Sequence, residues 1–182
     1  MKRIVLKYGL ASGAVVVTLM AVSLTLTMTG RLDFEGSEVV GYSTMVLAFL
    51  LVFFGIRAYR EETGGGAIGF GTAFKVGILI TLVTSAVYVL TWEIVYYGFY
   101  PNFLEDYQAH AMARMRAAGE AEAAIAAAQS EMAQFAELYR NPLVNIGFTF
   151  LEIFPVGLVM TLVSAGILRR KPAPIVAEAT AS

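Results

Sequence analysis

The sequence predicts an all-α integral membrane protein with four transmembrane helices and an extramembrane helical hairpin between the third and the fourth. Two observations predict this class. The chain is 58% hydrophobic and 15% charged, whereas soluble domains are about one-quarter charged. Its apolar residues also gather into long segments instead of alternating with polar ones. A single membrane domain is therefore expected over residues 1–171.

Four apolar segments have the length of a membrane span. About 20 helical residues cross about 30 Å of hydrocarbon, and a helix satisfies its own backbone amides there. Lys2 and Arg3 precede the first segment as they would precede a signal peptide, but the apolar stretch is too long and no small-residue cleavage site follows. It is therefore interpreted as a retained helix. The predicted spans are residues 4–28, 39–56, 74–97 and 143–168.

The lysines and arginines predict an orientation. Nine of the 13 flank one side of the predicted spans and four lie on the other. Because basic flanks are retained in the cytoplasm, both termini are expected on the cytoplasmic side of the membrane. The cytoplasmic set is Lys2, Arg3, Lys7, Arg57, Arg60, Lys75, Arg169, Arg170 and Lys171, and the outer set is Arg31, Arg114, Arg116 and Arg140.

Residues 101–141 form the one substantial insert between spans. Its alanine, glutamate and glutamine content favours helix. Pro101 suits a first helical turn, and Asn141-Pro142 is a natural stop. Apolar residues recur at helical spacing on both sides of Gly119, so either a hairpin that turns there or one kinked helix is expected on the outer face of the bundle.

Two cytoplasmic segments are expected to lack regular structure. Residues 172–182 have small residues, two prolines and no apolar period, which predicts a disordered tail. The glycine-rich loop 62–71 has no strand before it and no Gly-Lys-Ser/Thr after it, so the nucleotide-binding fingerprints fail. It is interpreted as a flexible linker that places Phe70 and Phe74 at the membrane interface.

Glu93 and Glu152 are the only acids inside the predicted spans. A buried charge there is costly, so an intramembrane carboxylate is a functional hypothesis by default. At ~1.5 Å per residue, Glu152 lies ~13 Å along the fourth span from Leu143, near its middle. Glu93 lies close to the aromatic residues at the outer end of the third span, within reach of interfacial water.

The fourth span surrounds Glu152 with further polar groups. Asn145, Thr149 and Glu152 recur at i, i+4 and i+7, so they share one helix face. Pro155 follows within a turn and frees a backbone carbonyl. One interpretation is a proton or cation site, or a polar ligand pocket open to the outside. The other is that Glu152 is protonated, or hydrogen-bonded to a residue such as Tyr42, Ser43 or Tyr88, and only stabilises the bundle.

Small residues predict close helix packing. Gly9 and Gly13 form a GxxxG pair that suits either internal or dimer contacts. Gly77 and Pro155 are further packing candidates on the third and fourth spans. Gly9 and Gly77, like Gly55 and Gly166, stand at corresponding ends of two predicted hairpins, which permits a parallel internal repeat. Shared membrane-helix composition explains the same pattern without a repeat.

The inventory argues against several classes of function. With no cysteine there is no thiolate site, and His110 has no ligand partners at helical spacing, so no metal or cofactor is expected. A net charge of −1 provides no footprint for nucleic acid. No nucleophile, base and oxyanion donors can be assembled from these residues, which counts against an enzyme.

Five segments of the chain form a recognisable pattern when they are taken together. They are Gly55-Ile56-Arg57-Ala58-Tyr59-Arg60, Gly65-Gly66, Phe70-Gly71-Thr72-Ala73-Phe74-Lys75-Val76-Gly77, Thr91-Trp92-Glu93-Ile94-Val95-Tyr96-Tyr97 and Phe150-Leu151-Glu152-Ile153-Phe154-Pro155-Val156-Gly157. These segments resemble an uncharacterised bacterial membrane family catalogued as domain of unknown function 4199. The resemblance covers nearly the whole chain before the tail and includes both membrane glutamates. It implies a small four-span protein of the bacterial inner membrane and assigns no activity, cofactor or substrate.

Two functions remain open at this point. The first is a noncatalytic membrane protein that acts by association with lipid, with a second copy of itself or with another membrane protein. The second is a small transporter or channel subunit that uses Glu152 for a proton or cation, with Glu93 at its outer mouth.

Overall fold

The chain folds into six helices, in a computed structural model that describes residues 1–31 and 34–170, without the side chains of 34, 35, 37 and 38. No strand occurs within these residues. Four helices are long and apolar enough to cross a bilayer. This confirms the predicted all-helical class and its four long apolar helices. The helices are α1 (Lys2–Met28), α2 (Phe34–Glu62), α3 (Phe70–Gly98), α4 (Phe103–Ala117), α5 (Glu122–Tyr139) and α6 (Pro142–Leu168).

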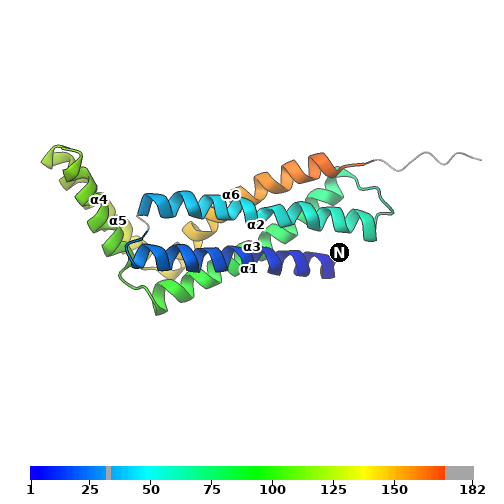
Figure 1. The fold of residues 1–182 in the computed structure, drawn as a ribbon, viewed down its shortest axis with the longest axis horizontal. Helices are drawn as coiled ribbons and strands as arrows, with labels where there is room; N and C mark the ends of the chain where they lie inside the picture. The colour runs from blue at the N-terminus through cyan, green and yellow to red at the C-terminus, as the bar shows by residue number, and fades with distance from the viewer. Residues whose placement is uncertain (32–33, 171–182) are drawn as a thin grey trace, which may run out of the picture.

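The four long helices form one bundle (Figure 1). α1 packs against α2 and α3, and α6 packs against the same two helices. The start of α1 and the end of α6 lie together at one end of the bundle, which we call the terminal end. The α4–α5 pair projects from the opposite end, which we call the hairpin end.

α2 and α3 are longer than the apolar segments 39–56 and 74–97 within them. An apolar run marks the part of a helix that suits hydrocarbon, whereas the helix itself continues while polar residues support it. At the end of α2, Arg57 Nε lies 2.9 Å from Glu61 Oε1 at i, i+4 spacing, a pair that favours helix. The predicted second span therefore ended before its helix does.

The terminal half of the bundle has a continuous apolar core. Phe49, Val52 and Ile56 of α2 are fully buried, as are Ile80 of α3 and Ile153 of α6. These side chains belong to one cluster that includes residues of all four long helices. Because a core of such side chains is closely packed, a change in the volume of any one of them is expected to lower the stability of the fold.

Glycines bring the long helices together in this half. A Cβ atom at Gly9 would lie 2.7 Å from Val83 Cβ, and one at Gly77 would lie 2.7 Å from Thr161 Cγ2. Such contacts require a residue without a side chain. Gly9, like Gly13 one turn later, thus packs against α3 within the chain, which is the internal alternative of the GxxxG pair. Gly166 has open space around it, so it does not match the close packing of Gly55.

Hydroxyl groups join the same helices. Ser12 Oγ donates to the carbonyl of Ala48 at 2.9 Å, which links α1 to α2. Thr84 Oγ1 donates to the carbonyl of Gly9 at 3.2 Å, which links α3 to α1. These buried hydroxyls are satisfied across helix interfaces, as a polar group in an apolar setting requires.

The glycine-rich loop is held in place, in contrast to the flexible linker predicted from its composition. Gly65 and Gly66 have φ angles of 58° and 87°, a left-handed conformation that favours glycine. Ile68 is buried and exchanges backbone hydrogen bonds of 3.0 and 2.9 Å with Arg170. The expected disordered tail, 172–182, lies outside the described residues.

The insert forms the hairpin and not the single kinked helix. Gly119, at a φ of 76°, lies in the turn between α4 and α5. The two helices pack against each other, and α5 also contacts α6. Asn141 caps α6 by accepting a 3.0 Å hydrogen bond from the amide of Leu143, and Pro142 occupies the first helical turn, where proline is favoured.

Candidate functional site

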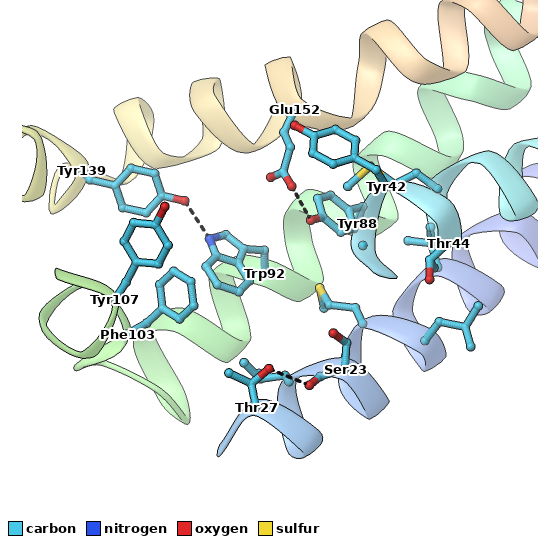
Figure 2. A pocket seen from close by; sticks show the side chains of 16 residues that line it. Ser23, Thr27, Tyr42, Thr44, Tyr88, Trp92, Phe103, Tyr107, Tyr139 and Glu152 are labelled. Carbon is cyan, nitrogen blue, oxygen red and sulfur yellow. Dashed lines mark hydrogen bonds between the residues drawn. The ribbon is translucent and has the colours of Figure 1, made fainter. Parts of the chain in front are cut away.

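A cavity of about 420 Å³ lies in the hairpin half of the bundle. Figure 2 shows its lining side chains, which come from all six helices. The four long helices form its walls, and Phe103 and Tyr107 of α4 close it together with Tyr139 of α5. The lining residues are Val16, Leu19, Met20, Ser23, Leu24, Thr27, Gly41, Tyr42, Thr44, Met45, Tyr88, Trp92, Phe103, Tyr107, Tyr139 and Glu152.

Glu152 is the carboxylate of this cavity. Tyr88 of α3 donates a hydrogen bond from its hydroxyl to Glu152 Oε1 at 3.4 Å. Tyr42 extends from α2 beside the same carboxylate (Figure 2). Tyr42 of α2 and Glu152 of α6 both line the cavity and are both exposed. Ser43, the other residue considered as a partner, is exposed and does not line the cavity.

A chain of four side chains joins three helices beside the cavity. Thr149 Oγ1 donates to Asn145 Oδ1 at 3.1 Å. Since a hydroxyl has one proton, Thr149 accepts from the Tyr139 hydroxyl, 3.3 Å away. Trp92 Nε1 in turn donates to Tyr139 at 2.9 Å. Burial raises the pKa of the Tyr139 hydroxyl, so this group retains the proton that the chain needs.

The sequence-predicted polar face of α6 is thus divided between two environments. Asn145 and Thr149 are buried in the helix interface and do not line the cavity, whereas Glu152 does. Tyr139 connects the two parts, because it lines the cavity and contacts Thr149. The Asn145 Nδ2 atom is buried and has no hydrogen-bond partner among the described residues.

Glu93 lies apart from the cavity. It does not belong to the lining, and its Oε1 atom is buried without a hydrogen-bond partner in the described part of the chain. The Tyr139 hydroxyl lies within electrostatic reach of both Glu93 and Glu152. The two carboxyl groups therefore share a neighbour, although only one of them faces the hollow.

Pro155 does not contribute to the cavity. It lies on an exposed face of α6, and the carbonyl that it leaves without an amide partner belongs to Leu151. Leu151 is 64% exposed, and neither residue lines the cavity. The polar groups beside Glu152 are consequently the tyrosines of other helices.

The lining chemistry suits binding. Of the lining residues that the structure describes, six are aromatic, one is a carboxylic acid, and none is a lysine, arginine or histidine. Within the described residues, no three histidine, cysteine or acidic side chains are grouped so that they suit a metal ion. A concave, largely apolar site with a few convergent polar groups is the usual form of a small-molecule pocket.

Sequence reasoning missed most of this lining. Trp92 belongs to the aromatic residues at the outer end of the third span, and its i+4 spacing from Tyr88 places both on one face of α3, which is the one signal that could have joined it to the site. Phe103, Tyr107 and Tyr139 gave no signal of a shared site, because they meet only when the hairpin folds back onto the bundle. Helical periodicity predicts which residues share one face of a helix, but it does not predict which other helix packs against that face.

Comparison with known proteins adds a family. No curated protein and no solved structure matched the chain. One family profile matches residues 7–170, which include α1 from Lys7 onward, the other three long helices and the hairpin. This is the family to which the sequence segments quoted above are similar. The chain belongs to the family described as protein of unknown function (DUF4199).

Proposed function

We propose that this chain is a noncatalytic, multi-pass membrane protein that binds a small ligand in the cavity at its hairpin end. The observation that carries the proposal is the cavity itself, a hollow of about 420 Å³ to which all six helices contribute. Its volume lies within the range of about 300–1,000 Å³ that is common for ligand sites. Association, and not chemistry, is the activity that this lining favours.

Exposed apolar faces support insertion in a bilayer. On α6, Leu151, Val159 and Leu162 are 64%, 57% and 44% exposed, and spacings of three and eleven residues between them place all three along one stripe. Soluble monomers rarely expose continuous apolar surface of this extent. We therefore assign lipid as the main partner of the outward faces, with a second copy or another membrane protein as the alternative cover.

The charge distribution supports an orientation in a bacterial inner membrane. Lys2, Arg57, Lys75 and Arg169 lie at the terminal end, and Arg114 lies on the projecting hairpin. Basic flanks favour the cytoplasm, which would place both termini inside and the cavity in the outer half. A reporter inserted after Gly119 is expected outside the cytoplasm, and a cytoplasmic signal would contradict this orientation.

Ligand retention tests the binding function. The full chain, extracted with its surrounding lipid, would be analysed by native mass spectrometry for a stoichiometric small molecule or lipid. Gly41 lines the cavity and has open space around it, so Gly41→Leu is expected to fill the hollow and release the ligand. Gly147 also has open space but does not line the cavity, which makes Gly147→Leu the matched control.

Two results would contradict the binding function. One is a gently extracted protein that never carries a stoichiometric ligand. The other is an equal ligand content in the Gly41→Leu and Gly147→Leu proteins, because the ligand would then lie elsewhere.

A second candidate is transport of a proton or cation. The observation in its favour is that Tyr139 lies within electrostatic reach of both Glu152 and Glu93. Intramembrane acids commonly mark ion pathways. In sealed vesicles with the reconstituted chain, Glu152→Gln is expected to abolish a pH- or cation-dependent flux if this candidate is right. If the flux is unchanged in the Glu152→Gln protein, Glu152 is not part of the pathway.

A further inference from the structure

Among the described lining residues, the charge has one sign. Glu152 is the only carboxylic acid of this set, and the set contains no lysine, arginine or histidine. Tyr88 donates a hydrogen bond to the carboxylate at 3.4 Å, and a neutral phenol does not cancel a negative charge. An anion in this hollow would meet the carboxylate at short range, whereas a cation would be attracted to it.

Aromatic rings surround the same space. Tyr42 and Tyr88 lie next to Glu152, while Trp92, Phe103 and Tyr107 form the side toward the hairpin (Figure 2). The rings of Trp92 and Phe103 pack edge to face, with centroids 5.1 Å apart. Aromatic faces carry partial negative charge and attract ammonium groups within about 6 Å. Several such faces beside one carboxylate are the usual chemistry of an organic-cation site.

We propose that the ligand of this cavity is an organic cation, a substituted ammonium group with an apolar body, whose charge lies beside Glu152 among the aromatic rings. The inference rests on the proposed binding function and names the class of its ligand. The apolar body would pack on Met20 and Met45, flexible side chains that adapt to varied shapes.

The size of the hollow limits the ligand. At about 420 Å³ it lies near the small end of ligand sites. It therefore holds a small free amine or the ammonium headgroup of a lipid, and not a complete lipid. Tyr42 and Glu152 line the cavity and are exposed, so a ligand from either source can reach the carboxylate.

The test compares a permanent cation with a neutral molecule of the same shape. Benzyltrimethylammonium and its carbon isostere neopentylbenzene would be titrated against the full chain in phosphatidylglycerol vesicles. Trp92 is the only tryptophan of the chain and lines the cavity, so its fluorescence reports occupancy directly. The cation is expected to bind at least about tenfold more tightly than the neutral isostere.

Glu152→Gln is the decisive variant. Gln retains an acceptor for Tyr88 and removes the charge, so the affinity for the cation is expected to fall at least about tenfold, while that for the neutral isostere stays unchanged. Glu93→Gln is the matched control, because Glu93 does not line the cavity. Tyr42→Leu is expected to weaken the cation about three- to fivefold, and Tyr42→Phe, which keeps the ring, is not.

The outcomes separate the ligand class from the binding function. Equal affinity for the two probes overturns the cation inference and leaves the cavity as a binding site. An unchanged cation affinity in Glu152→Gln, or an equal loss of both probes, also overturns it. If neither probe binds the unaltered chain, the inference fails, and the Gly41→Leu retention experiment still judges the binding function by itself.

Lipid composition identifies the source of the cation. In vesicles that contain phosphatidylethanolamine, the probe is expected to bind more weakly if a lipid ammonium headgroup already occupies the cavity. Equal probe affinity with and without that lipid indicates a free amine. Both results support an ammonium ligand and differ only in whether a lipid headgroup or a free amine supplies it.

Discussion

The two halves of the bundle use the same four helices in opposite ways. In the terminal half, glycines and small hydroxyl residues bring the helices together around fully buried side chains such as Phe49, Ile56 and Ile80. In the hairpin half, aromatic and polar side chains surround a hollow of about 420 Å³. The difference teaches that the packed half supplies the stability and thereby permits a cavity in the other half.

The contrast is visible within single helices. On α3, Gly77 and Thr81 are in close contact with α6, whereas Tyr88 and Trp92, two to three turns later, face the cavity. On α6, Gly157 packs against Thr81 and Phe49, while Glu152 lines the hollow. A change of residue size along each helix is therefore sufficient to change packing into a site.

The largest expected effect comes from removing a ring of the packed half. Phe49→Ala is expected to lower the free energy of unfolding by about 3–5 kcal/mol, since it opens a cavity in a filled core. Phe103→Ala removes the same atoms from the wall of an existing hollow and should cost clearly less. Unfolding in mixed micelles with increasing denaturing detergent measures both, and equal losses would break the distinction between the halves.

A smaller effect is expected from adding one methyl group. A Cβ atom at Gly157 would overlap Phe49 and Thr81, so Gly157→Ala is expected to destabilise the chain by up to about 3 kcal/mol. On the same helix, Gly147 has open space, and Gly147→Ala should stabilise it by up to about 1 kcal/mol. The two variants must differ in sign when their thermal unfolding is compared.

The hydrogen-bond chain beside the cavity provides a further test of the difference between the halves, because we expect it to stabilise the hairpin half. Thr149→Val removes the donor to Asn145 and the acceptor of Tyr139, and a loss of about 1–2 kcal/mol is expected. Thr91→Val is the control, since that hydroxyl only bonds to its own helix at Val87. If both variants lose the same stability, the hydrogen bonds of Thr149 do not hold the hairpin to the bundle.

The smallest effect on stability is expected at the cavity wall. Gly41→Leu should change the free energy of unfolding by less than about 1 kcal/mol, because the added side chain enters open space and helix propensity improves. It should nevertheless abolish the response of Trp92 fluorescence to added ligand. A large destabilisation would indicate that this half is packed as tightly as the other.

Much of this fold was accessible from the sequence. Long apolar segments predict the four long helices, and Gly119 between two helical patterns predicts the place of the turn. These features are local, since they depend on period, composition and one conformation that glycine favours. The C-terminal end of α2 lies beyond the predicted span because the Arg57–Glu61 pair continues the helix past the apolar run.

The candidate site was only partly accessible. The pairing of Glu152 with Tyr88 was one of the alternatives, because both lie on apolar helices that must bury their polar groups. The contacts of Tyr139 with Trp92 and of Ile68 with Arg170 join distant segments, and no periodicity indicates them. What decides the site is how the hairpin closes over the bundle, which is tertiary information.

The most direct test of a hollow hairpin half uses the absence of cysteine in this chain. Ser23 and Ser12 both lie on α1 and are 7% and 0% exposed, but only Ser23 lines the cavity. In vesicles, Ser23→Cys is expected to react with a small methanethiosulfonate reagent and to be protected by bound ligand, while Ser12→Cys stays unreactive. Equal reactivity of the two cysteines, or no protection by any ligand, would contradict the account.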